Sequence, residues 1–290
     1  MPRPSERNEH MELPLAHHGR SATRMPVSVP PLWIGSSVLV SVLVAITSLC
    51  GILLEQTYAR ETPAWAVQAV GQDWANLAVV VLLLAGTYFV WNHSFRGYLV
   101  WLGAYLYLVY AFAIYAFAVH FQFLFLAYVL VLGLSFFTLV GGLQAARPAT
   151  FNRALAGNSA APAASLLLFV IGAMFAVLWL SEIVPNLVAG TVPQSLEETQ
   201  LWVNPVHVLD LAFLLPGLIA TSVLLRREEF LGNLMAVPLL VFSAAMGLGI
   251  VVNFVISAVR GLPFPLPAAV IVGAIVLLST WVAWQFLKDV

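Results

Sequence analysis

The sequence contains few charged residues. Only 9% of its 290 residues are Asp, Glu, Lys or Arg, and 61% are hydrophobic, whereas soluble domains average about 25% charged residues. A water-facing surface this apolar would aggregate. The composition therefore excludes an ordinary soluble protein and indicates that much of the chain lies in lipid.

The sequence also lacks the short segments of alternating apolar and polar residues that a transmembrane β-barrel requires. Stretches such as 75–90 and 268–287 are instead apolar almost throughout. Within a bilayer, only helices and closed barrels satisfy every backbone polar group. The predicted fold class is therefore all-α, a polytopic bundle of membrane-spanning helices.

An excess of basic residues is missing, and cysteine is scarce. The formal net charge is -1, so no basic surface is available for nucleic acid, which we exclude as a partner. Cys50 is the only cysteine in the sequence, which rules out an intrachain disulfide. The apolar run that contains it, 32–54, is longer than the core of a cleaved signal peptide and is interpreted as a retained first span.

Eight segments are long and apolar enough to cross a bilayer, which takes about 20 residues. They lie at 32–54, 74–91, 98–119, 124–143, 163–180, 208–225, 234–259 and 268–287. Residues 32–290 are thus predicted to form one transmembrane domain. Residues 1–31 are polar and proline-rich, contain His10, His17 and His18, and are predicted to form a disordered cytoplasmic tail.

The basic residues indicate which loops face the cytoplasm, because short cytoplasmic loops are enriched in Lys and Arg. With both termini inside, only Arg60 and Arg260 fall outside. The basic residues assigned to the cytoplasm are Arg3, Arg7, Arg20, Arg24, Arg96, Arg147, Arg153, Arg226, Arg227 and Lys288. This bias predicts a multipass protein of the cell inner (plasma) membrane with cytoplasmic N- and C-termini.

The two halves of the chain share a sequence pattern. Asp73 precedes an apolar span that is followed by FRGYL at 95–99, and Asp210 precedes an apolar span that is followed by FLGNL at 230–234. Four spans per unit would keep the orientation of the unit in the membrane. The pattern therefore favours a parallel 4+4 repeat about an axis along the membrane normal.

The densest polar cluster lies at the outward end of the sixth span and contains Asn204, His207 and Asp210. Asn204 suits a helix N-cap, and Pro205 suits the first helical position. His207 and Asp210 are three residues apart and so share one helix face. A carboxylate there would orient the imidazole and raise its basicity, as general-base pairs require; the alternative is a structural pair at the membrane interface.

Two further carboxylates are predicted at outward helix ends. Glu182 closes the fifth span, where the helix dipole disfavours a negative charge, so it needs water or a partner such as His207 or a bound cation. Asp73 is placed to cap the second span or to line the same outer cavity as Asp210.

His120 and Tyr110 complete the candidate substrate-binding residues. His120 follows the third span on the outside and, with His207 and the carboxylates, gives a set of side chains suited to zinc or iron. No short metal-binding motif is present, however, so the sequence leaves both metal and cofactor undetermined. Tyr110 lies within the third span, where its hydroxyl needs a hydrogen bond to another helix or to a ligand.

Three polar or helix-breaking residues lie within later spans. Pro216 and Pro238 are predicted to break the sixth and seventh spans, freeing backbone carbonyls. Asn253 is predicted to link two helices through its amide.

Three strings carry a resemblance to known proteins: Gly71-Gln72-Asp73, Leu180-Ser181-Glu182-Ile183-Val184-Pro185, and Asn204-Pro205-Val206-His207-Val208-Leu209-Asp210 with Pro216. Through them the chain resembles an uncharacterised family of bacterial multipass membrane proteins, over about spans two to seven. The resemblance implies a shared topology and functional interest in these residues, but no reaction. The chain departs from the family after Tyr110, where Ala111 and Phe112 replace an Asn-containing stretch.

The leading functional hypothesis is a small-solute carrier or permease with an outward cavity between the two halves, in contact with His207, Asp210, Glu182 and Asp73. Its weak point is the membrane midplane, where the predicted spans place no charged residue, although proton-coupled carriers usually have one. A cavity that reaches the midplane would favour this hypothesis.

Two other functions stay open. One is an integral membrane enzyme acting on a lipid or quinone-like substrate at the outer leaflet, with His207 as general base and Asp210 orienting it; a shallow bowl open to lipid would favour it. The other is a receptor or assembly factor that uses the loop at 181–203. The lipid bilayer is the expected partner, a small-molecule or lipid ligand is anticipated, and the oligomeric state is undetermined.

Overall fold

The chain folds into a bundle of helices. The computed structural model describes residues 27–261 and 265–290, so residues 1–26 of the tail predicted to be disordered, with His10, His17 and His18, lie outside the described residues. Residues 27–30 of that predicted tail are described, and among them Val27 is buried and forms an isolated β-bridge with Ala146. Eight helices within the described ranges are long and apolar enough to cross a membrane. The predicted all-α, multipass membrane fold is confirmed.

The eight spans form two sets of four with short elements between them. The first set comprises α1 (Pro31–Leu53), α2 (Pro63–Trp91), α3 (Phe95–Ala118) and α4 (Phe125–Gln144), with the 3-10 turn η1 (Glu55–Tyr58) after α1. The second set comprises α6 (Ala161–Ala189), the sixth span, α10 (Phe230–Val259) and α11 (Leu266–Lys288). The sixth span consists of α8 (Pro205–Leu209), the π-helical turn η2 (Asp210–Leu214) and α9 (Leu215–Arg226). The short helices α5 (Pro148–Leu155) and α7 (Gln194–Thr199) lie outside the spans.

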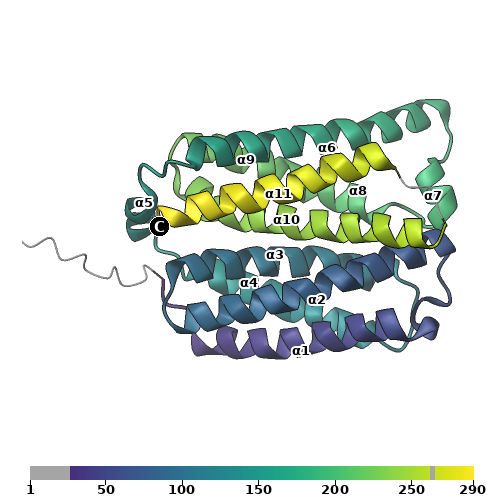
Figure 1. Cartoon of the computed structure of the whole chain (residues 1–290), viewed down its shortest axis with the longest axis horizontal. Helices are drawn as coiled ribbons and strands as arrows, with labels where there is room; N and C mark the ends of the chain where they lie inside the picture. Colours follow the sequence, from purple (N-terminus) through teal and green to yellow (C-terminus); the bar gives the residue numbers. More distant parts are fainter. Residues whose placement is uncertain (1–26, 262–264) are drawn as a thin grey trace, which may run out of the picture.

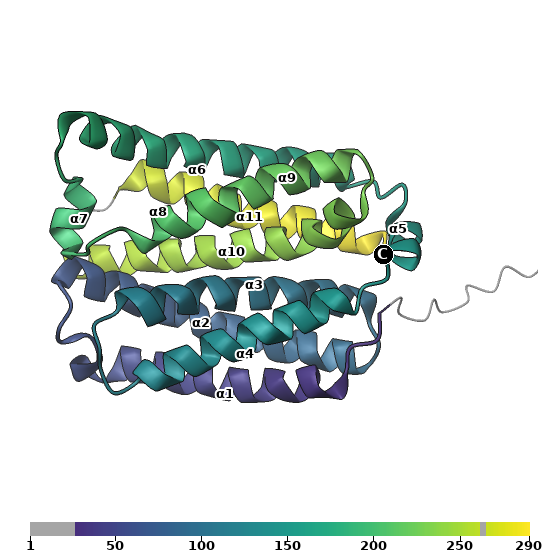
Figure 2. The same ribbon diagram turned by 180° about the vertical axis from the view of Figure 1, so that it is seen from behind.

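Each set of four packs as its own unit. In the first unit, α1 and α3 each contact both α2 and α4; in the second, α6 and α10 each contact both α9 and α11. The units meet because α10 packs against α2 and α3, and Figures 1 and 2 show them side by side. α1 begins and α11 ends at the end of the bundle where α5 lies, whereas α7 lies at the opposite end.

The outside of the bundle is apolar. Large hydrophobic side chains such as Phe89, Phe137, Leu178 and Leu277 are exposed along the helices, although a soluble monomer seldom exposes large contiguous apolar patches. Because the lipid tails of a bilayer are as apolar as these side chains, the exposed surface agrees with a position in lipid.

The turns that lead into α3 and α10 have matching geometry. His93 and Glu228, each two residues before the Phe that begins the helix, both have a positive φ, 57° and 55°. At the next residue, the Ser94 N–H donates to the Phe89 carbonyl at 2.8 Å and the Glu229 N–H donates to the Leu224 carbonyl at 3.0 Å. Donor and acceptor occupy corresponding positions in the two turns. The strings FRGYL and FLGNL, which share the pattern FxGxL, are therefore each preceded by the same kind of turn.

Glycine is required at the corresponding positions Gly97 and Gly232. A Cβ added at Gly97 would overlap the Cβ of Phe89, and one added at Gly232 would overlap the amide nitrogen of Leu225. At both glycines, the added Cβ would lie much closer to its neighbour than van der Waals contact allows. The spacing of Phe and Gly that the two strings share therefore reflects a close helix-to-helix approach after each turn.

Equivalent residues of the two units also face each other. Alignment of the FxGxL strings pairs Gly103 of α3 with Pro238 of α10, and a Cβ added at Gly103 would lie 2.8 Å from the Pro238 carbonyl oxygen. Phe151 of α5 is buried between the equivalent Phe95 and Phe230, with ring centroids 4.8 Å and 5.6 Å away and near-perpendicular planes. Contacts between equivalent residues are what a two-fold axis produces, so they support the parallel repeat.

Two sequence-based helix boundaries and one predicted helix break were wrong. α2 begins at Pro63 with Thr62 as its N-cap, so Asp73 lies ten residues inside the helix and cannot cap it. α6 continues through Pro185 to Ala189, so Glu182 is not at a helix end. α10 is continuous through Pro238. Polar residues or prolines were taken as boundaries in these helices, but buried partners or the membrane interface accommodate them within the helix.

The sixth span is interrupted as predicted. Pro216 lacks an N–H, and the residues before it form the π-helical turn η2, in which the Leu215 N–H donates to the carbonyl of Asp210. A π turn widens the helix and often occurs at functional sites. Asp210 is the first residue of that turn.

The glycine requirement gives a stability prediction. Gly232→Ala should lower the free energy of unfolding by about 1–3 kcal/mol, because its new Cβ meets backbone that cannot move aside cheaply, and Gly97→Ala should also destabilise. Gly133→Ala is the matched control, since none of the described residues lies within 4 Å of its added Cβ. Thermal unfolding in detergent measures the effect; an equal melting temperature for Gly232→Ala and Gly133→Ala would contradict the packing described for the turn.

Candidate functional site

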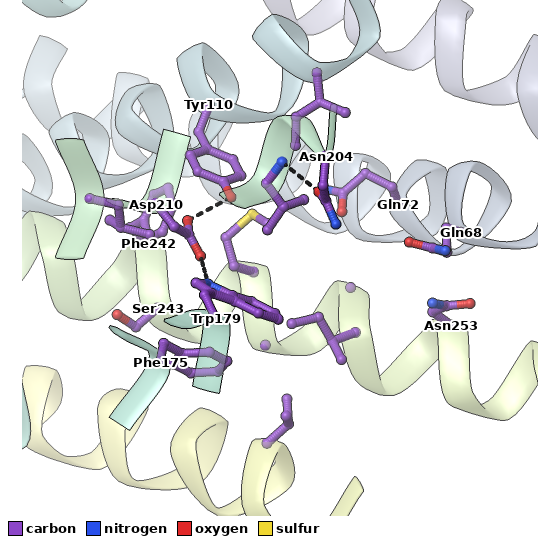
Figure 3. Close-up of a pocket in the computed structure, with 18 of the residues that line it drawn as sticks. Gln68, Gln72, Tyr110, Phe175, Trp179, Asn204, Asp210, Phe242, Ser243 and Asn253 are labelled. Atoms are coloured by element: carbon purple, nitrogen blue, oxygen red, sulfur yellow. Dashed lines mark hydrogen bonds between the residues drawn. The ribbon is translucent and has the colours of Figure 1, made fainter. Parts of the chain in front are cut away.

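A cavity of about 310 Å³ lies between the two four-helix units. Its walls come from α2, α3, α6, the sixth span, α10 and α11. Most of the wall is apolar. Its aromatic side chains include Trp65, together with Phe175, Trp179 and Phe242, which Figure 3 labels. Its polar side chains are Gln68, Gln72, Tyr110, Tyr115, Asn204, Asp210, Ser243 and Asn253.

The cavity runs from the α7 end of the bundle to the middle of the spans. Trp65, Asn204 and Asn253 line it near helix ends on that side, and Ser243 lines it deep within α10. Val259 is the last residue of α10, and Ser243 lies about 24 Å before it along the helix. The cavity therefore reaches about halfway along α10.

Asp210 is the only Asp, Glu, Lys, Arg or His side chain among the described residues that line this cavity. The Tyr110 hydroxyl donates to its Oδ1 at 2.7 Å, and the Trp179 indole N–H donates to its Oδ2 at 2.7 Å. Figure 3 shows the carboxylate held between the two rings. An indole N–H can only donate, so this pair of donors suits an ionised carboxylate that keeps further lone pairs for a ligand.

The local sequence explains how Asp210 reaches this place. Asn204 caps α8, its Oδ1 accepting the Val206 N–H at 2.9 Å, and Pro205 is the first helical residue. The predicted helix start is confirmed. One turn later the helix widens into η2 at Asp210. The sixth span thus starts at the α7 end of the cavity and brings the Asp210 carboxylate into the cavity wall.

His207 does not pair with Asp210, although both are on one helix. Its Nε2 lies 3.7 Å from Oε2 of Glu182, and its ring packs on Trp179 with centroids 4.6 Å apart. Ser195 of α7 also donates to Oε1 of Glu182 at 2.6 Å. Glu182 therefore has the His207 partner that the sequence suggested, whereas the orientation of His207 by Asp210 is not observed, because the His207 ring lies against Trp179 and Glu182.

His120 belongs to a separate contact. Its Nδ1 lies 2.9 Å from Oε2 of Glu61, and its backbone N–H donates to Oε1 of the same side chain at 2.8 Å. It does not line the cavity. Among the described residues, no group of three or more His, Cys, Asp or Glu side chains is placed to hold a metal ion.

Asp73 lies behind the cavity wall, inside the first unit. The residue is 1% exposed; Tyr58 donates to its Oδ2 at 2.6 Å and Tyr115 to its Oδ1 at 2.8 Å. A Cβ added at Gly51 of α1 would overlap Oδ2 of Asp73. Asp73 therefore does not share the cavity of Asp210, contrary to the prediction. The pKa of the neighbouring Tyr58 is raised above its ordinary value, first by burial and then by the charge of Asp73.

The tyrosines of α3 connect these polar groups. Tyr110 donates to Asp210 and Tyr115 to Asp73, while the hydroxyl of Tyr107 donates to Oδ1 of Asn76 at 2.8 Å. Buried polar atoms in a membrane must find such partners within the protein. Asn253 is the exception in the cavity wall, because its buried Oδ1 has no hydrogen-bond partner among the described residues.

Sequence reasoning missed several members of the site. Trp179 and Trp65 line the cavity, and Tyr58 and Asn76 belong to the surroundings of Asp73. An aromatic residue in an apolar run has the same pattern in lipid, in the core or in a cavity. The usable signal was a polar residue within an apolar span, which singled out Tyr110 and Asn253 but required the fold to supply their neighbours.

The chain was compared with protein-family models, curated proteins and solved structures, and nothing matches it in any of the three comparisons.

The two donors at Asp210 give a testable prediction. Tyr110→Phe keeps the ring but removes one donor, so it should lower the free energy of unfolding by about 1–3 kcal/mol. Tyr88→Phe is the control, because Tyr88 is 65% exposed. In the Asp210→Asn background, the cost of Tyr110→Phe should shrink, since no charge is left buried. Equal costs in both backgrounds, measured by unfolding in detergent, would argue against the bond.

Proposed function

We propose that the protein is a carrier for a small, largely apolar solute that bears a positive charge. The observation that carries the proposal is the cavity between the units, which reaches the middle of the spans and whose described wall contains one carboxylate among aromatic side chains. A depth of about half the span is expected of a carrier that hands its substrate across the membrane. A shallow bowl at the interface would have suited the enzyme better.

The chemistry of the wall supports the substrate class. Apolar and aromatic side chains favour an apolar body, and a few polar groups fix its orientation. Tryptophan and tyrosine rings attract a cation through their faces, and Asp210 supplies the opposite charge. Since no basic side chain lines the cavity within the part of the chain that the structure describes, an anionic solute would meet an uncompensated carboxylate.

The distribution of basic residues supports an orientation in which the cavity lies toward the outer side of the membrane. The proposed topology has both termini in the cytoplasm of a cell with an inner (plasma) membrane, because the ends and loops near α5 hold most of the basic residues. The α7 end of the bundle, from which the cavity extends inward, would then face outward. The proposed relatives are the uncharacterised bacterial multipass family that the strings at 71–73, 180–185 and 204–210 resemble.

The enzyme hypothesis loses its main support. It required Asp210 to orient His207 as a general base, but His207 contacts Glu182 and Trp179 and does not line the cavity. A receptor that uses residues 181–203, which form the end of α6 and the segment with α7, has no specific observation in its favour.

Binding of benzyltrimethylammonium tests the proposal, because this probe joins a small aromatic body to a fixed positive charge. We expect the protein in lipid nanodiscs to bind it, and Asp210→Asn to weaken binding by about tenfold or more, the equivalent of about 1.4 kcal/mol. Reconstituted vesicles should take up the probe, and Asp210→Asn should slow this uptake.

Two controls separate the carrier from its rivals. Glu55→Gln removes an exposed carboxylate outside the cavity and should leave binding unchanged. His207→Ala should weaken binding less than Asp210→Asn does, because His207 does not line the cavity and touches its wall through Trp179. Equal binding by the wild type and Asp210→Asn, or no binding by either, would overturn the proposed substrate class; binding without uptake would overturn the carrier.

A further inference from the structure

Asp73 is a buried carboxylate toward the α7 end of the first unit, where it contacts Gly51, two residues before the end of α1, and Tyr115, three residues before the end of α3. It lies ten residues from Pro63, the start of α2, which is about 15 Å into the helix. The partners that the described residues give it are neutral hydroxyl groups, and neither of the ion pairs His120–Glu61 and His207–Glu182 includes it. An ionisable residue placed in this way is costly and usually functional.

A one-way chain of hydrogen bonds links Asp73 to the cavity. The Gln72 amide donates to the Tyr107 hydroxyl, which donates to Asn76, and the Asn76 amide donates to the Tyr115 hydroxyl at 3.3 Å. Tyr115 then donates to Asp73. Gln72 and Tyr115 both line the cavity. The hydrogen bonds of these two side chains therefore belong to one chain that ends at the Asp73 carboxylate.

Proton binding would reverse the end of this chain. A carboxylate that takes up a proton on Oδ1 becomes neutral and loses acceptor capacity there. Tyr115 has a second acceptor within reach, the Ala69 carbonyl oxygen at 3.3 Å, beside Asp73 at 2.8 Å. Ala69 also lines the cavity. The hydroxyl of Tyr115 can therefore turn from Asp73 toward the carbonyl of a cavity-lining residue.

A proton suits this site better than a metal cation. Both carboxylate oxygens already accept phenolic hydrogens, and a metal ion would have to displace these donors and find several further oxygen ligands. A proton needs only one lone pair. It also removes the energetic cost of an uncompensated charge in a low-dielectric interior.

We propose that Asp73 is the proton-binding site that couples a proton gradient to this carrier, with Tyr115 and Gln72 transmitting its protonation state to the cavity. This inference rests on the proposed transport function and adds its energy source. The bound proton comes from water on one side of the membrane and is released to water on the other. Asp210 keeps the separate task of binding the solute.

The described surroundings of Asp73 contain few other groups that titrate. They are Tyr58 from η1, Tyr107 and Tyr115 from α3, and Tyr128 from α4, with Cys50 from α1 near Tyr128. None of them is a carboxyl group. A protonated-carboxyl band that Asp73→Asn removes and Asp210→Asn, at the other buried aspartate, leaves in place therefore reports Asp73.

Infrared difference spectroscopy of the protein in nanodiscs tests the site without any ligand. We expect a protonated-carboxyl band that titrates with pH in the wild type, is lost in Asp73→Asn and persists in Glu55→Gln. Tyr58→Phe should shift the band without removing it, because it takes away one donor to Oδ2, and this variant serves if Asp73→Asn fails to fold. A band that neither Asp73→Asn nor Tyr58→Phe alters would overturn the proposal.

Transport measurements test the coupling. A pH difference across reconstituted vesicles should change wild-type uptake of benzyltrimethylammonium by about fivefold or more, the lower end of ordinary coupling energies. Asp73→Asn should still bind the probe but should lose this response, and Tyr115→Phe should reduce it. A full response in Asp73→Asn would overturn the coupling role alone, whereas failure of the wild type to bind the probe would overturn the proposed function and leave the infrared result standing.

Discussion

A carboxylate inside a membrane protein has to find its hydrogen-bond donors among the protein's own side chains, because the lipid offers none. This constraint explains the composition of α3. Its buried tyrosines serve both units of the bundle, since Tyr115 donates to Asp73 in the first unit and Tyr110 donates to Asp210 in the second. The second donor differs, Tyr58 for Asp73 and Trp179 for Asp210. The position of α3 between the units follows from this shared task as well as from packing.

The two units resemble each other where they pack and differ where the cavity lies. The turns before α3 and α10 repeat their hydrogen bonds at corresponding residues, and Gly103 approaches its equivalent, Pro238, directly. A strict two-fold would also make α3 contact the sixth span as closely as α10 contacts α2. Instead, α10 packs along α2, whereas α3 closely meets the sixth span only at α8. The cavity occupies this missing contact, with Asp210 in its wall.

Side-chain volume accounts for the closed contact on the opposite side. A Cβ added at Gly71 of α2 would lie 2.9 Å from the Cα of Asn253 of α10, so the absence of a side chain at Gly71 allows these helices to touch. Where the contact between α3 and the sixth span is missing, Trp179 and Tyr110 project toward Asp210 from α6 and α3. Large rings bonded to a carboxylate at that place hold α3 and the sixth span apart while they satisfy both of its oxygens.

The sequence predicted the fold well because lipid enforces a simple rule. Segments such as 32–54 and 268–287 had to be helices, and α1 and α11 match them within two residues. Prediction failed at the ends of α2 and α6, where Asp73 and Glu182 were interpreted as boundaries. Both carboxylates lie within helices because tertiary partners satisfy them: Tyr58 and Tyr115 for Asp73, Ser195 and His207 for Glu182.

The site was predicted less completely than the fold, again because tertiary partners from other helices decide where its side chains lie. Spacing along one helix correctly identified Asn204 as a cap and placed Asp210 among the candidates, but it also paired Asp210 with His207. That pairing depends on which rings enter between the two side chains, and Trp179 comes from another helix, α6. Local spacing describes one helix face, whereas a membrane cavity is made of several faces, so its chemistry follows from helix contacts that the spacing does not contain.

Separate burial of the two aspartates gives each a different accessible chemistry. Asp210 has a cavity in front of it, so a solute with a cationic group can reach its remaining lone pairs. Asp73 is enclosed by Tyr58, Tyr115 and the backbone at Gly51, where an added Cβ would already collide with the carboxylate. On the Gly51 side, the carboxylate has no room even for a methyl group. If the two carboxylates descend from one duplicated position, packing at Gly51 is what restricts the first to protons, and the missing contact beside α3 is what opens the second to a solute.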